Sequence, residues 1–411
     1  MTDQTKDIRH MMSKVPEVTI FFWVIKVLCT TVGETASDFL NVNLNFGLTG
    51  TSILTGVLLL IALVFQFRAK KYVPALYWIN VVLISIFGTL VTDNLTDSIG
   101  VPLEVSTIVF SVLLAITFAV WYRREKTLSI HSIFTKRREC FYWLTILFTF
   151  ALGTATGDLM AESLGLGYAV TGAIVCAVIA AAAIAWRLGL NSILAFWIIY
   201  ILTRPLGASL GDYLSQPAKY GGLGLGATVT SVIFLLAILA TVMFLSFTKR
   251  DLVEDASVRE EEAKQGGALR QVAAVIGLLV LVSGAGYYWR HTALQNEESV
   301  VSVPTTGTNG STSPTPHVSP LGDLSGFRTI TQDTLDFVLA GKFSEAKTRV
   351  SDLEHDWDIA QSKLKPMNKA KWTEMDDAID QVLRQVRAVN PNADACKSAL
   401  EKLLAIIDSN Q

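Results

Sequence analysis

The amino-acid sequence predicts an all-α, polytopic membrane protein, and its composition, its apolar segments and an internal repeat all support this class. Of the 411 residues, 51% are hydrophobic and only 17% are charged, and the mean hydropathy is +0.43. This balance excludes a disordered chain and argues against an ordinary soluble enzyme. The formal net charge of -2 gives no reason to expect a nucleic-acid partner. The expected surroundings of the chain are a lipid bilayer.

Apolar segments long enough to cross a membrane recur along the first 290 positions. A hydrocarbon core of about 30 Å requires about 20 helical residues. Backbone groups in lipid must be hydrogen-bonded within the segment, so helices are expected rather than isolated strands. We expect nine such helices, near residues 17–40, 48–67, 74–92, 105–122, 141–160, 168–186, 192–212, 225–247 and 271–289.

Lys and Arg residues gather in every second connection between these segments. They occur in the N-terminal tail (1–16), in FRAKK (67–71), between YRREK and TKRRE (122–139), at Arg187 and in TKR (248–250). Basic connections stay in the cytoplasm, so the N-terminus is expected there and the region after the ninth helix outside. The first apolar run is too long for a cleaved signal peptide. The expected location is therefore a bacterial inner membrane, crossed several times.

Four copies of one pattern run through the first eight segments. In the first copy, Gly33 follows Trp23 by ten positions and Asp38 follows Gly33 by five. The same spacing recurs in Trp78, Gly88 and Asp93, in Trp143, Gly153 and Asp158, and in Trp197, Gly207 and Asp212, and each Trp follows an aromatic residue (Phe22, Tyr77, Tyr142 and Phe196). Each unit contains the motif helix, a Gly-bearing connection and a second apolar helix, so the four units are parallel repeats across residues 17–248.

The spacing suggests a role for each motif residue. Fifteen helical residues place the Asp about 22 Å from the Trp, near the outer end of the helix. We expect the Trp residues to anchor the inner interface and the Gly residues to allow close helix packing. Residues four apart share a helix face, so Glu34 stacks with Asp38. Arg204 lies on the equivalent stripe of the fourth repeat, where it could pair with Asp212 or Glu34 or contact an anionic substrate.

This pattern resembles that of bacterial integral membrane proteins built from four tandem repeats, each with two transmembrane segments and a characteristic tryptophan, which are grouped as a repeat of unknown function. The resemblance covers about residues 20–247 and rests on the four sets of Trp, Gly and Asp. It implies the architecture of eight helices in four repeats. It implies no activity and no site residues, which must come from the side chains themselves.

The repeat carboxylates admit two interpretations. A charge at mid-membrane costs about 2.5 to 3.5 kcal/mol, so such residues are candidates for function. If the repeats surround a common axis, Asp38, Asp93, Asp158 and Asp212, helped by Glu34, would form an oxygen-rich site for a small cation or for protons. Parallel repeats could equally pair into two halves. Alternatively, each Asp ends its helix near the outer headgroups and caps the following turn.

Two functions follow as hypotheses. The first is a transporter of small cations, with a divalent metal such as manganese exchanged for protons as one candidate. The alternative is a membrane-anchored sensor or scaffold that signals through its extracytoplasmic domain. The sequence contains no P-loop, no HExxH, no paired CxxC and no GxSxG motif, so neither an enzyme activity nor a cofactor is expected. The metal ligands and the oligomeric state stay unassigned.

The remaining chain divides into four parts. Residues 249–270 are a charged cytoplasmic connection, 271–289 the ninth membrane helix and 290–322 a flexible linker rich in Ser, Thr and Pro. Residues 323–411 show apolar positions at alternating spacings of three and four, which predicts a small antiparallel bundle of four helices. A mostly acidic cluster in this region is expected to form a solvated face, with a metal site as the alternative. It contains Glu354, His355, Asp356, Asp358, Asp376, Asp377 and Asp380.

Overall fold

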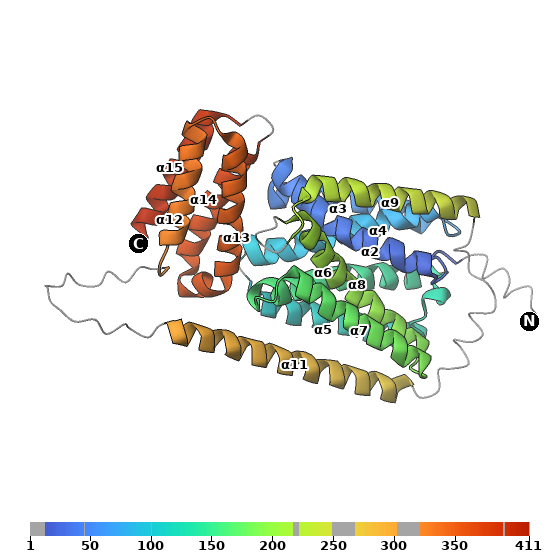
Figure 1. The fold of residues 1–411 in the computed structure, drawn as a ribbon. Helices are drawn as coiled ribbons and strands as arrows, with labels where there is room; N and C mark the ends of the chain where they lie inside the picture. Colours follow the sequence, from blue (N-terminus) through green and yellow to red (C-terminus); the bar gives the residue numbers. More distant parts are fainter. Residues whose placement is uncertain are drawn as a thin grey trace, which may run out of the picture. The chain divides into compact units, whose positions relative to one another are not determined.

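The computed structural model describes residues 13–44, 46–99, 101–216, 222–248, 268–301, 321–388 and 391–410. Within these ranges the chain is helical and contains no strand. It divides into two compact units, one containing the repeats and the other the C-terminal helices (Figure 1). Most of the charged connection predicted at 249–270 and of the linker predicted at 290–322 lies outside the described residues.

The described residues include nine helices long and apolar enough to cross a membrane, as predicted. The repeats form α2 (Ile20–Asp38), α3 (Gly47–Arg68), α4 (Pro74–Asp93), α5 (Leu103–Glu125), α6 (Lys136–Asp158), α7 (Tyr168–Arg187), α8 (Ser192–Ser215) and α9 (Gly226–Thr248). The ninth candidate span lies within α11 (Ala268–Val301). The protein is therefore a polytopic, all-α membrane protein.

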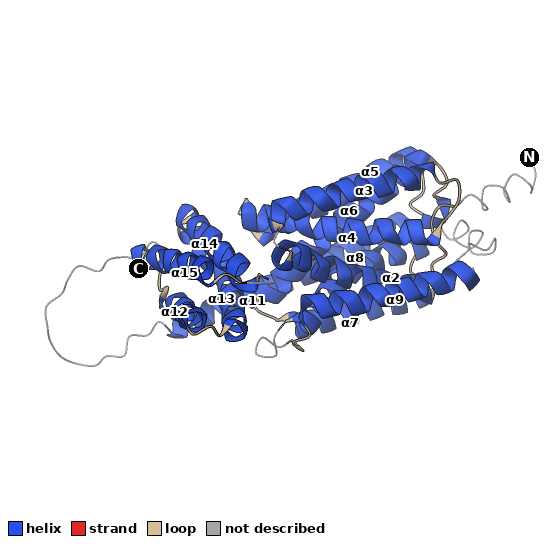
Figure 2. Cartoon of the chain, turned by 90° about the horizontal axis from the view of Figure 1, so that it is seen from above, coloured by secondary structure: helices blue, strands red, loops and turns tan. Residues whose placement is uncertain are grey.

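The first helices of the four repeats close into a ring. Helix α2 packs against α4, α4 against α6, α6 against α8, and α8 against α2. The second helices lie outside, where α3 packs on α4, α5 on α6, α7 on α8 and α9 on α2. Each outer helix thus covers the ring helix of the following repeat, and α9 completes the cycle. Figure 2 shows these helices running side by side. Of the two arrangements left open by the sequence, the protein adopts the ring.

Burial separates the ring helices from the outer helices. In the most apolar part of each ring helix, 56% to 61% of the residues are buried, against 11% to 28% in the outer helices. The side chains that the outer helices expose include Ile53, Leu60, Ile108 and Leu236, all of them apolar. Contiguous apolar surface of this kind suits contact with lipid. The repeat polar residues therefore lie inside the unit, away from the lipid-facing surface.

Three ring helices change geometry directly after the repeat Asp. A π-helical turn follows Asp38 (Phe39–Asn43), Asp93 (Asn94–Ser98) and Asp158 (Leu159–Ser163). In the fourth repeat, α8 continues past Asp212 to Ser215 as an α-helix. In three repeats the α-helix thus ends at the Asp and the chain continues as a π-helical turn, whereas in the fourth it continues as an α-helix. Such π-helical turns occur frequently at functional sites.

The C-terminal unit is the predicted bundle of four helices: α12 (Ser325–Leu339), α13 (Phe343–Met367), α14 (Lys369–Arg387) and α15 (Ala393–Ser409). Each helix packs on two neighbours, in the order α12, α13, α14, α15 and back to α12. Gly341, at a φ of +71°, ends the first helix, where the amide of Lys342 donates to the carbonyl of Phe337. The rings of Trp357 and Trp372 stack in the core, with centroids 5.6 Å apart.

Candidate functional site

The repeat glycines bring neighbouring ring helices into close contact. A Cβ atom added at any of them would overlap a residue of the next repeat: Gly33 meets Ser85, Gly88 meets Phe150, Gly153 meets Arg204, and Gly207 meets Thr30. Each of these partners lies three positions before the Gly of its own repeat. The same contact therefore occurs four times around the ring. This is the close approach expected of the repeat glycines.

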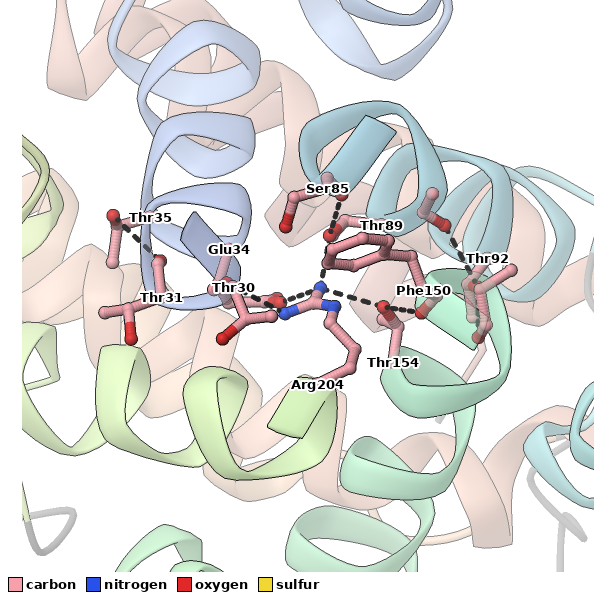
Figure 3. Close-up of polar contacts among 12 residues, drawn as sticks. Thr30, Thr31, Glu34, Thr35, Ser85, Thr89, Thr92, Phe150, Thr154 and Arg204 are labelled. Carbon is pink, nitrogen blue, oxygen red and sulfur yellow. Dashed lines mark hydrogen bonds and ion pairs between the residues drawn. The ribbon is translucent and has the colours of Figure 1, made fainter. Parts of the chain in front are cut away.

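Arg204 of α8 lies at the centre of the ring (Figure 3). Its guanidinium donates to the Glu34 carboxylate at 2.5 Å, to the Thr154 hydroxyl at 2.8 Å, and to the Thr89 hydroxyl. It also donates to the Thr30 carbonyl at 3.1 Å. Glu34, Thr89 and Thr154 occupy the same position, eleven residues after the Trp, in the first three repeats. One side chain of the fourth repeat thus joins equivalent positions of the other three, which marks the axis of the ring.

The Arg204 contact is an internal ion pair. Only 1% of the Arg204 side chain and 12% of the Glu34 side chain are exposed. Burying two charges is costly, and hydrogen bonds to the remaining donors offset part of that cost. The threonine hydroxyls and the Thr30 carbonyl supply those bonds. Of the two expected partners of Arg204, the structure shows the ion pair with Glu34. The pair lies on the axis at this level.

The four repeat Asp residues lie one helical turn beyond this level. Asp38, Asp93 and Asp158 follow Glu34, Thr89 and Thr154 by four residues and therefore share their helix faces, and Asp212 is the equivalent residue of the fourth repeat. Asp212 is buried, and the other three are partly buried. Within the described ranges, no three His, Cys, Asp or Glu side chains gather closely enough to hold a metal ion. We call this level of the ring the Asp end.

A second cation, Lys26 of α2, lies two turns before Glu34 on the same helix. Its ammonium nitrogen is 4.0 Å from the centre of the Phe150 ring and 4.3 Å from that of Tyr200. The residue is 1% exposed, and among the described residues its nitrogen has no hydrogen-bond partner. Lys26 is not among the site residues that the repeat pattern predicts. A signal was present, because it is the one charged residue in the stretch FFWVIKVLCTT (21–31).

Aromatic side chains fill the opposite end of the ring, which we call the Trp end. Trp78, Trp143 and Trp197 are 1%, 4% and 4% exposed, and Trp23 is partly buried. These three rings therefore pack among protein side chains instead of anchoring the lipid interface as expected. The physical reason is the ring itself, which turns the face bearing the Trp inward. The Trp197 indole donates to the Leu128 carbonyl at 2.9 Å.

Three buried tyrosines belong to this aromatic layer, where their rings pack on the Trp rings. The hydroxyls of Tyr77 and Tyr142, which precede the Trp of their repeats, share a hydrogen bond of 2.5 Å. Tyr200 lies four residues after the equivalent Phe196, and its buried hydroxyl interacts electrostatically with Tyr142. Hydroxyl groups therefore extend from the ring contact of Lys26 into the Trp end.

A buried lysine in the same unit has different surroundings. Lys14 donates to the Glu139 carboxylate at 2.6 Å and to the Phe67 carbonyl at 3.3 Å. The Gln66 amide donates to the second oxygen of Glu139 at 3.1 Å. This ion pair ties the segment before α2 to the ends of α3 and α6. Lys14 therefore has the compensating carboxylate that Lys26 lacks.

Comparison with known proteins identifies the repeats. The family described as Repeat of Unknown Function (DUF347) matches residues 21–72, 76–127, 141–188 and 195–251. These four matches coincide with the four pairs of ring and outer helices. No curated protein matches the chain. No solved structure matches it.

Proposed function

The chain belongs to the family defined by this repeat, and we propose that it is a transporter of small cations coupled to protons, with the substrate path along the axis of the helix ring. The observation that carries the proposal is the contact of Arg204 with Glu34, Thr89 and Thr154. Equivalent positions of three repeats meet there. The repeat Asp residues lie one turn further on the same faces, so we infer that they surround the same axis.

The charges along the axis favour a cation at the Asp end. Glu34 compensates Arg204, and the four repeat Asp residues bring further carboxylates to that end. Carboxylate oxygens are suitable ligands for divalent cations such as manganese. Neighbouring carboxylates also share protons readily, because mutual repulsion favours protonation of one of them. In this proposal Asp38, Asp93, Asp158 and Asp212 bind the cation or a proton, and Glu34 assists.

The π-helical turns after three of the Asp residues provide a means of movement. A π-helical turn adds a residue to one turn of the helix and is readily rearranged. In the proposal these turns let the carboxylates approach one another when a cation enters. The expected location is a bacterial inner membrane, with the N-terminus in the cytoplasm and the C-terminal bundle outside, and no catalytic activity is expected.

Uptake into proteoliposomes tests the proposal. We expect vesicles containing the full chain to take up manganese, followed by an enclosed metal-sensitive dye, with protons moving in the opposite direction. Replacement of all four repeat Asp residues by Asn should reduce uptake to that of empty vesicles. Glu104→Gln is the matched control, because Glu104 lies in the first turn of the outer helix α5 and should leave uptake unchanged.

Two results would contradict the cation proposal. One is uptake at the wild-type rate by the quadruple Asp→Asn protein, which would remove the Asp residues from the path. The other is the absence of uptake by the wild-type protein for every divalent cation of a panel. Circular dichroism of each variant verifies that its helices have formed.

A sensor or scaffold is the second candidate, and the separate C-terminal unit favours it. A bundle with its own core can recognise a partner independently of the membrane helices. Expression of residues 1–250 in a strain lacking the gene distinguishes the two functions. The transporter proposal expects the truncated chain to restore the phenotype, since the ring closes within α2 to α9. The sensor proposal expects no restoration.

A further inference from the structure

From its surroundings we propose that Lys26 binds and releases the coupling proton in the middle of the membrane domain. The inference rests on the proposed proton-coupled transport and assigns the proton to a residue outside the carboxylate set. The Lys26 nitrogen is enclosed by side chains and has no hydrogen-bond partner among the described residues. The ligand that such an atom can take without displacing a neighbour is a proton.

The surroundings of Lys26 accommodate both protonation states. The faces of the Phe150 and Tyr200 rings, whose centres are 4.0 and 4.3 Å from the nitrogen, stabilise the ammonium form. Burial favours the neutral amine, because a charge away from water is costly unless it is paired. A permanently charged buried lysine normally has a carboxylate beside it, as Lys14 has Glu139. Among the residues that the structure describes, no carboxylate forms an ion pair with Lys26, so neither protonation state is strongly favoured.

The titratable groups around Lys26 come from the elements packed against α2. Cys29 on α2 and Arg204 on α8 interact electrostatically with Lys26. Tyr200 of α8 lies beside its nitrogen, and the Tyr77 and Tyr142 hydroxyls of α4 and α6 lie beyond Tyr200. Helix α9 carries no titratable side chain. Among these groups the Arg204 guanidinium carries a full charge, which Glu34 neutralises in part.

This arrangement couples Lys26 to the Asp end by electrostatic repulsion. Protonated Lys26, Arg204 and a bound cation would be three positive charges along one axis at low dielectric. A cation at the Asp end therefore favours release of the proton from Lys26, and a proton on Lys26 favours release of the cation. Mutual exclusion of this kind is the requirement for exchange.

In the proton step, the one bond that forms and breaks is the bond between the proton and the Lys26 nitrogen. A proton adds to the lone pair of the Lys26 amine to give the ammonium group, and the same nitrogen later returns a proton. The Tyr200, Tyr142 and Tyr77 hydroxyls extend from Lys26 toward the Trp end. Each can accept and donate a hydrogen bond. The proposed route of the proton runs along these hydroxyls, between Lys26 and the Trp end.

Two substitutions of Lys26 test the proposal. Lys26→Met removes the amine and keeps much of the side-chain volume. The ring accommodates an apolar residue at this position, because the equivalent residues Val81 and Ile146 are fully buried in the second and third repeats. Lys26→Arg keeps a positive charge that is not released at physiological pH. Neither variant can exchange a proton at this site.

The first measurement is an acid-base titration of the detergent-purified full chain. Over the pH range in which the protein stays folded, the wild-type protein should bind about one proton more than Lys26→Met and than Lys26→Arg. Ile146→Met, at the equivalent position of the third repeat, is the matched control, because it introduces the same side chain without removing a titratable group, and it should bind as many protons as the wild type. Equal proton binding by wild type and Lys26→Met would overturn the proposal.

The second measurement follows manganese and protons together in proteoliposomes. Lys26→Met should lose the opposing proton flow while retaining manganese binding at the Asp end. Wild-type proton flow in this variant would overturn the proposal, even with a difference in titration. A wild-type protein that moves no cation would contradict the proposed function instead. In that case the titration alone decides whether Lys26 exchanges a proton.

Discussion

The membrane ring and the C-terminal bundle are both built from helices, yet the ring has an ion pair at its centre and the bundle has an apolar core. The ring places an ion pair, Arg204 with Glu34, at its centre, and the outer helices around it expose apolar side chains. The bundle places an apolar core around Trp357 and Trp372 and its ion pairs toward solvent. In lipid, apolar contact gives little drive for helix association, so close packing and internal hydrogen bonds take that role. In water, burial of apolar surface suffices.

The largest effect is expected when the Arg204 guanidinium is removed from the centre of the ring. Arg204→Met leaves Glu34 without its partner inside the ring and should destabilise the membrane unit by about 3 to 5 kcal/mol. The loss is measured as a lower melting temperature in detergent and as faster hydrogen exchange in α2 and α8. Arg187→Met, at an exposed position of α7, is the matched control with the same change of charge. Equal melting temperatures of the two variants would contradict the central role of Arg204.

Truncation of an apolar core residue should act mainly on the bundle. Trp357→Ala removes a ring that is 2% exposed and stacked on Trp372, and should cost about 3 kcal/mol. Hydrogen exchange of the full chain should accelerate in α13 and α14 and stay unchanged in α2 to α8. Leu339→Ala, at a residue 62% exposed, serves as the control. Acceleration in both units would show that they are not independently stable.

Close packing in the ring can be tested by adding one methyl group. In Gly153→Ala the new Cβ would overlap the Arg204 side chain, and the strain should cost about 1 to 3 kcal/mol. Gly172→Ala is the control, because its Cβ would lie 3.4 Å from Ser209, at an ordinary contact distance. The measurement is the difference in melting temperature between the two variants. A tolerated Gly153→Ala would argue against a tightly closed ring.

The smallest effect is expected for an ion pair of the bundle. Arg387 donates to both carboxylate oxygens of Glu354, but the two side chains are 17% and 32% exposed. Water therefore solvates the remaining charge when one partner is lost. Arg387→Met should cost less than about 1 kcal/mol, measured by hydrogen exchange in α13 and α14. A loss as large as that of Arg204→Met would remove the distinction between the two units.

Much of the fold could be predicted from the sequence, while only part of the site could. The spacing of Trp23, Gly33 and Asp38 predicted the repeat and the glycine contacts between helices. The same spacing suggested lipid-facing anchors, but Trp78, Trp143 and Trp197 are buried. A periodic pattern identifies a helix face without identifying what that face contacts. Lys26 was missed because it breaks the repeat, and a search for matching positions passes over such a residue.

The sequence by itself determined the nine membrane helices and their fourfold repetition, because a chain in lipid must satisfy its backbone hydrogen bonds locally, within each segment. Only the tertiary structure decided that the first helices close into a ring, that Arg204 bonds to Glu34, and that Lys26 faces aromatic rings. These contacts join distant parts of the chain, Arg204 and Glu34 being 170 positions apart. They depend on how four similar helices meet, and local sequence patterns do not encode that arrangement.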